Sequence, residues 1–148
     1  MRSVISNTSC LIVLSNIGRL DLLRAVYSTV LITDEVLVEF GEAIPKWIIA
    51  TSVKDKTKTM LISNSLDKGE ASTIALALEQ EDSLLILDDG KARHFAEGLN
   101  LALTGTLGVV VKAKKMGIID DIAEIIAELR SAGFRLPNDI ESVLLKES

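Results

Sequence analysis

The apolar run from Leu84 to Leu87 constrains the fold of this chain more than any other stretch. Four consecutive Leu and Ile residues between polar neighbours are typical of a strand buried on both faces, as in parallel sheets. Asp88 and Asp89 follow at once, so we expect them at the carboxyl end of a central strand. Ligands bind at that edge in open α/β sheets. A plainer interpretation stays open, because Asp89 is also suited to be the N-cap of the next helix.

Short β-rich runs alternate with segments of helical periodicity along the chain. We expect strands at 3–6, 29–32, 84–87 and 101–103. We expect helices from 7 with a break at 18, then at 33–40, 66–82, 90–97, 104–116, 120–130 and 137–145, with a short helix at 45–49 and a polar, exposed stretch at 54–58. This alternation predicts an α/β fold, a three-layer sandwich with a short central parallel sheet. Nothing marks a boundary, so one domain is expected over 1–148.

Composition limits the partners and the compartment. With 16 basic and 21 acidic residues the net charge is -5, so a nucleic-acid partner would need a local basic patch or bound cations. Cys10 is the single cysteine and lies in an apolar run, which predicts a buried structural thiol and suits a reducing cytoplasm. Residues 3–18 are uncharged, but they are short for a membrane span and no cleavage pattern follows. We therefore expect a soluble, cytoplasmic protein.

Polar side chains follow three of the predicted strands. Asn7 follows the first, Asp88 and Asp89 the third, and Thr104 the fourth, so these residues converge if the strands are neighbours. Glu70 joins them plausibly, since it lies in the first turn of the helix that leads into the third strand. An alternative stays open here too, because the spacing from Asp67 to Glu70 is that of a capping box.

Glu39 lies between Val38 and Phe40 on a largely apolar helix, so its charge needs a partner or a cation. Carboxylates without a His-x-His or Cys-x-x-Cys pattern favour Mg²⁺ or Mn²⁺ over zinc. His94 is most simply a residue of a helix surface.

Five motifs, in this order, resemble the PIN-domain family: Asn7-Thr-Ser9, Glu39, Gly69-Glu70-Ala71, Leu87-Asp88-Asp89-x-Lys-Ala-Arg93 and Thr104-Gly-Thr-x-Gly108. The resemblance covers almost the entire chain. Within the family it is most similar to prokaryotic toxin-type (VapC-like) ribonucleases and their little-characterised relatives. The resemblance implies a parallel sheet flanked by helices and Mg²⁺- or Mn²⁺-dependent endonuclease action on RNA, single-stranded or structured. It also implies homodimers or larger homo-oligomers, and an antitoxin protein as a partner.

The resemblance also assigns roles to individual residues. The metal-site positions of the family fall on Asn7, Glu39, Glu70 and Asp89, with Asp88 an adjacent candidate for the last. Glu39, Glu70 and Asp89 would be catalytic, and Thr8, Ser9 and Thr104 would be hydroxyls near the site. The basic residues that would meet the RNA backbone are Lys91 and Arg93, with Lys112, Lys114 and Lys115, for which a solvated helix face is an equal explanation.

The chain departs from the family at its first acidic position, where Asn7 replaces an aspartate. An amide oxygen can bind a cation, but it brings no charge and cannot act as a base. The prediction is therefore a toxin-like, metal-dependent endoribonuclease with attenuated activity. The alternative is a catalytically inert PIN-like module that binds RNA or a protein partner. A phospho-acceptor signalling domain is less favoured, because it requires an acidic pair after the first strand.

Overall fold

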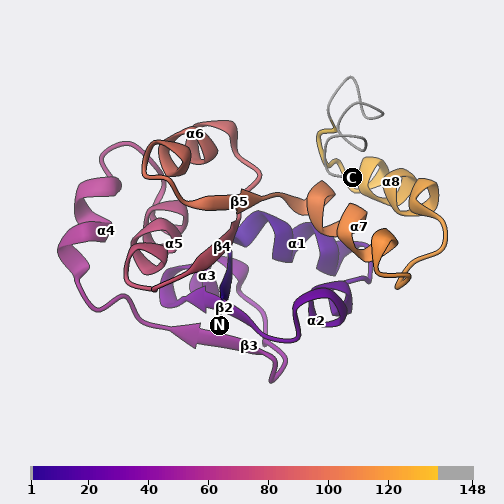
Figure 1. Cartoon of the computed structure of the whole chain (residues 1–148), viewed down its shortest axis with the longest axis horizontal. Helices are drawn as coiled ribbons and strands as arrows, with labels where there is room; N and C mark the ends of the chain where they lie inside the picture. The colour runs from indigo at the N-terminus through magenta and orange to yellow at the C-terminus, as the bar shows by residue number, and fades with distance from the viewer. Residues whose placement is uncertain (1, 137–148) are drawn as a thin grey trace.

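Five parallel strands form the central sheet of the computed structural model, which describes residues 2–136 (Figure 1). Their order is β3-β2-β1-β4-β5. The strands are β1 (Ser3–Ser6), β2 (Val30–Thr33), β3 (Ile48–Thr51), β4 (Ser83–Ile86) and β5 (Ala102–Thr104). The four strands predicted from the sequence are all present, each within a residue of its expected position.

Helices cover both faces of the sheet. They are α1 (Thr8–Asn16), α2 (Asp21–Tyr27), α3 (Asp34–Phe40), α4 (Lys56–Ile62), α5 (Lys68–Leu78), α6 (Gly90–Gly98), α7 (Thr106–Lys115) and α8 (Ile122–Ser131). In Figure 1, α4, α5 and α6 lie on one side of the sheet, and α1, α2, α7 and α8 lie on the other. The α/β three-layer sandwich predicted from the sequence is confirmed. The helix expected at 137–145 lies outside the described residues.

Two hydrophobic clusters, one on each face, bury the sheet. Neighbouring residues of a strand belong to different clusters: Val4 packs with α1, α2 and α7, whereas Ile5 packs with α5 and α6. In β4, Ile86 belongs to the same cluster as Val4, and Leu85 belongs to the same cluster as Ile5. Both residues are fully buried. This two-sided burial explains why β4 is an uninterrupted apolar run rather than an alternating one.

The prediction was wrong between residues 45 and 62. The short helix expected at 45–49 is a turn, closed by Ile48 N donating to Pro45 O, that leads into β3. Residues 48–51 form an edge strand because they pair with β2. Local periodicity could not reveal this pairing. The stretch at 54–58 is largely exposed, as predicted, but α4 begins within it and was not predicted; the side chain of Asp55 accepts from Thr57 N and caps this helix.

The carboxyl ends of β1, β4 and β5 are level with one another. Ser6 pairs with Ile86, and Ile86 pairs with Thr104. Beyond the pairs, Asn7 N donates to Ile86 O at 3.1 Å, and Leu87 N donates to Thr104 O at 2.9 Å. We call this line of strand ends the carboxyl edge. Asn7, Asp88 and Thr104 were predicted to converge if their strands were neighbours. The three strands are neighbours, so this prediction is confirmed.

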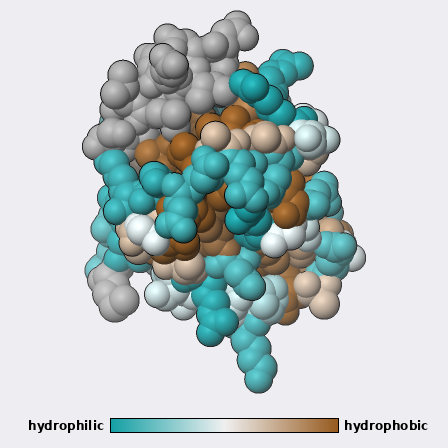
Figure 2. Space-filling model, turned by 90° about the vertical axis from the view of Figure 1, so that its right-hand side faces the viewer, coloured by the Kyte–Doolittle hydropathy of each residue, from teal (hydrophilic) through white to brown (hydrophobic). Residues whose placement is uncertain are grey.

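The surface at the α8 end of the molecule is mixed in character. Figure 2 shows hydrophobic residues exposed between hydrophilic ones on this face. None of the helices in residues 2–136 is both long enough and apolar enough to span a membrane.

Candidate active site at the carboxyl edge

Asn7 lies at the N-cap of α1 but does not cap it. Its backbone is extended, yet its side chain makes no cap hydrogen bond. The residue is 6% exposed, and its Oδ1 is buried without a hydrogen-bond partner in the described part of the chain. An unsatisfied buried acceptor costs about 1–3 kcal/mol, so native proteins rarely leave one without a ligand, water or ion. The amide oxygen of Asn7 thus matches the donor expected of a cation site.

The next residue links α1 to α3. Thr8 Oγ1 donates to Glu39 Oε1 at 2.5 Å. The partner that the sequence required for Glu39 is therefore a hydroxyl, and the carboxylate itself is exposed.

Glu39 also lies against the first turn of α5. A Cβ atom built on Gly69 would lie 2.1 Å from Glu39 Oε1, far inside van der Waals contact. A side chain at this position would therefore displace the Glu39 carboxylate from its place against α5. Gly69 thereby leaves room for Glu39 beside the first turn of α5.

Glu70 carries the strongest electrostatic perturbation among the acids of the site. Its side chain is 8% exposed, and burial raises the pKa from 4.5 to about 7, with the charges of Asp67 and then Asp89 adding to the rise. Asp67 Oδ1 accepts from Glu70 N at 2.8 Å and caps α5, so the capping interpretation of this pair is confirmed. Capping of α5 by Asp67 does not exclude a role for Glu70 in the site, because the charge of Asp89 also contributes to the raised pKa of Glu70.

The two aspartates after β4 do different things. Asp89 Oδ2 accepts from Ala92 N at 3.0 Å, which confirms the N-cap interpretation, but the residue is exposed. Asp88 accepts two hydrogen bonds from Thr106, from N to Oδ1 at 2.7 Å and from Oγ1 to Oδ2 at 2.6 Å. Both oxygens of Asp88 are thus engaged in holding the turn from β5 into α7. Asp89 is the more accessible carboxylate for a ligand.

The other predicted residues lie around this edge with unequal exposure. Thr104 ends β5 and is buried, whereas Ser9 and Lys91 are exposed. Arg93 Nη1 donates to Leu87 O at 2.7 Å, so its guanidinium is held at the carboxyl edge rather than extended into solvent. His94 is exposed, as expected.

Two other predictions concern residues away from the acids. Cys10 is a buried free thiol whose pKa is raised to about 12, chiefly by burial, which confirms a structural rather than a reactive thiol. Lys112 Nζ lies 5.0 Å from the centroid of the Tyr27 ring, and Lys114 donates to the carbonyl of Asp120. These local contacts favour the helix-face explanation for the lysines of α7.

The side-chain oxygens of the site suit a hard cation, although they do not form a complete coordination shell. Asn7, Glu39, Glu70 and Asp89 offer oxygen only, which suits Mg²⁺ or Mn²⁺. Within residues 2–136, no three His, Cys, Asp or Glu side chains lie close enough to hold one ion. The acids therefore lie along the edge in neighbouring pairs, with the unpartnered Asn7 Oδ1 as an additional donor.

Sequence reasoning missed three residues that shape the site. Gly69 permits the approach of Glu39, and Thr106 engages Asp88. Thr33 Oγ1 lies 2.7 Å from Ser72 Oγ and joins the end of β2 to α5. The glycine before Glu70 was a visible signal, but the two threonine contacts have no local signature.

Comparison with known families agrees with this geometry. The family model DUF3368, a PIN domain, matches residues 3–148. The searches of curated proteins and of solved structures gave no significant match. PIN domains are generally nucleases and typically use divalent metal ions. A match over nearly all residues, together with the parallel sheet and its flanking helices, shows that this chain belongs to the PIN-domain family.

Proposed function

We propose that this protein is a divalent-metal-dependent endoribonuclease of the toxin type, attenuated by Asn7. One observation carries the proposal: the buried, unpartnered Oδ1 of Asn7 adjoins the hydrogen-bonded pair of Thr8 and Glu39. The environment of Glu70 supports it further: burial, and then the charges of Asp67 and Asp89, raise the pKa of this carboxyl, and a bound cation would stabilise its charged form.

The side chains of the site would have separate roles in the reaction. Because no three acids in residues 2–136 lie close enough to hold one ion, Mg²⁺ or Mn²⁺ would be held by neighbouring members of the set Glu39, Glu70 and Asp89, with the amide oxygen of Asn7 as a further ligand and water completing the shell. A divalent ion bound there would supply an activated water and neutralise the charge that builds on the phosphate. Thr8 fixes the position of Glu39 through its hydroxyl.

Asn7 is the reason for expecting weak activity. It lowers the negative charge of the donor set by one and cannot accept a proton. Cation affinity and rate should both fall relative to a chain with aspartate at this position.

The substrate and partners follow from the same proposal. The substrate would be RNA, single-stranded or structured, whose backbone would meet Lys91 and Arg93. A second copy of the chain and an antitoxin protein are the proposed protein partners. Large exposed apolar side chains outside the site support such contacts, among them Leu61 on α4 and Met116 at the end of α7.

Cleavage of fluorescent single-stranded RNA by purified protein tests the proposal. The wild type should cleave in Mn²⁺ or Mg²⁺ and not in EDTA, whereas Glu70→Gln with Asp89→Asn should be inactive. Glu97→Gln on the exposed face of α6 serves as the matched control and should behave as the wild type. Equal, metal-independent cleavage by all three proteins would indicate a contaminating nuclease and refute the proposal.

A catalytically inert module is the second candidate, favoured by the neutral Asn7 and by the lack of a three-acid group in residues 2–136. It predicts RNA binding without cleavage in any metal. Asn7→Asp separates the two candidates, because restored charge should increase cleavage by an attenuated nuclease but leave an inert module inactive.

A further inference from the structure

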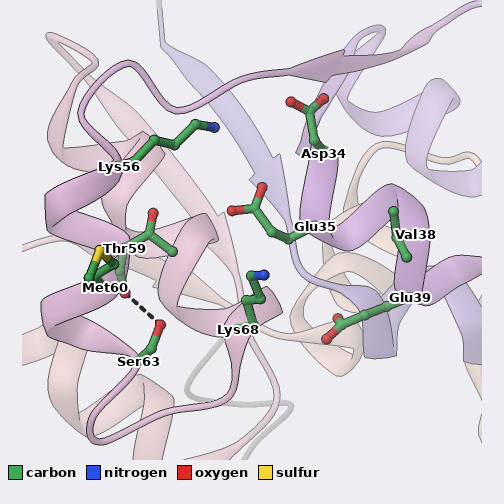
Figure 3. Close-up of a pocket in the computed structure, with 9 residues that line it drawn as sticks. All are labelled: Asp34, Glu35, Val38, Glu39, Lys56, Thr59, Met60, Ser63 and Lys68. Carbon is green, nitrogen blue, oxygen red and sulfur yellow. Dashed lines mark hydrogen bonds between the residues drawn. The ribbon is translucent and has the colours of Figure 1, made fainter.

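A cavity of about 560 Å³ lies between α3 and α4, next to the candidate active site (Figure 3). Its volume falls within the range of small-molecule pockets. Glu39 lines it and also accepts from Thr8, so this α3–α4 pocket adjoins the carboxyl edge. Whatever occupies the pocket would therefore lie beside a substrate bound at the acids.

Two polar atoms of the α3–α4 pocket are buried without partners among the described residues. They are Glu35 Oε1 on α3 and Thr59 Oγ1 on α4. Thr59 is only 5% exposed, and in Figure 3 the carboxylate of Glu35 extends from α3 toward α4. A buried carboxylate oxygen without a donor is costly, so the pocket calls for a ligand that brings N–H groups.

Four of the remaining lining residues suit a flat ring that carries a phosphate, whereas Asp34 and Glu39 add two further carboxylates to the lining. Val38 and Met60 line the pocket and are 80% and 70% exposed, so they offer apolar surface to an aromatic face. Lys56 and Lys68 are exposed and make no ion pair within residues 2–136. Their ammonium groups are available to a phosphate or a carbonyl oxygen.

We propose that the α3–α4 pocket binds a guanine base of the RNA substrate, with Glu35 as the specificity-determining residue. The Watson–Crick edge of guanine presents two adjacent donors, N1–H and the N2 amino group, which one carboxylate can accept together. Adenine and cytosine present one donor beside an acceptor, and uracil one donor between two acceptors. These acceptors would face the negative charge of Glu35. The inference deepens the proposed function, on which it rests for its substrate class.

Nucleotide binding without metal tests the pocket separately from catalysis. Titration of the protein with GMP, AMP, CMP and UMP, followed by NMR chemical shifts, should give the tightest binding for GMP, by roughly tenfold, the scale of one bidentate contact. Glu35→Gln should remove most of that preference, because an amide offers one acceptor and one donor. Glu42→Gln, an exposed neighbour outside the pocket, should keep it. Equal binding of all four nucleotides, or a preference unchanged in Glu35→Gln, would overturn the inference.

A second measurement keeps the two proposals distinguishable. If the wild type cleaves RNA, its cleavage sites should adjoin guanine, and those of Glu35→Gln should lose this preference. Cleavage with the same base preference in both proteins would refute the guanine pocket and leave the nuclease intact. GMP binding that depends on Glu35 in a protein without cleavage would support the pocket and refute the nuclease. Shifts caused by an arginine-containing peptide but not by GMP would overturn the guanine assignment in favour of a protein partner.

Discussion

Glu70 should make the folded protein less stable as the pH rises. Its pKa is about 7 in the folded state against an ordinary value of 4.5, chiefly because of burial. Between these values the folded state binds more protons than the unfolded state, so the free energy of unfolding falls with increasing pH. The loss of stability caused by the charge of Glu70 is complete above its folded-state pKa of about 7 and absent below its unfolded-state pKa of 4.5.

The magnitude follows from the two pKa values. Each pH unit between 4.5 and about 7 corresponds to about 1.4 kcal/mol, which gives an upper limit of about 3 kcal/mol. Salt screens the repulsion from Asp67 and Asp89, and solvent screens a carboxylate near the protein surface, so about 1–2 kcal/mol is the expected size. Glu70→Gln removes the charge while keeping the shape and one acceptor oxygen. It should therefore be more stable than the wild type by about 1–2 kcal/mol near pH 8, and nearly equal to it near pH 5.

Urea denaturation in EDTA, followed by circular dichroism near pH 5 and pH 8, measures this difference. Glu97→Gln is the control, and its difference from the wild type should not change with pH. If Glu70→Gln were destabilised equally at both pH values, Glu70 would matter only as a hydrogen-bonding group and the charge argument would be wrong.

Four further predictions concern the site and the assembly. Asn7→Asp should bind Mn²⁺ about tenfold more tightly in titration calorimetry, because a charge enters the donor set; unchanged affinity would place Asn7 outside the site. Gly69→Ala should displace the Glu39 carboxylate at little cost in stability, because only the end of a flexible side chain must move, and thermal unfolding should lose its Mn²⁺ response; a wild-type response would contradict this. Thr106→Val should cost about 1–3 kcal/mol in urea, because Asp88 loses a donor, and Thr106→Ser should not; equal losses would show that the hydroxyl is unimportant. Light scattering should give about twice the 16.0 kDa chain mass, and a monomer at tens of micromolar would refute the dimer.

Local patterns sufficed for most of the fold. The Leu84–Leu87 run predicted a central strand, because burial on both faces demands continuous apolar residues. Asp67 and Asp89 were readable as helix caps, since capping depends on residues three apart. The errors fell where distant partners decide the structure. Edge strand β3 exists through its pairing with β2, and α4 packs its buried face against α5.

The sequence by itself determined the α/β class, four of the five strands and the chemical type of the donors. These properties follow from periodicity and from residue identity, which are local.

Only the tertiary structure decided which side chains meet. Thr8 reaches Glu39 across 31 positions, and Thr106 engages Asp88 across 18. No sequence spacing encodes such contacts, because they depend on strand order and on how closely α3 and α5 pack. The space left by the missing side chain of Gly69 is also what lets the Glu39 carboxylate lie beside the turn that carries Glu70.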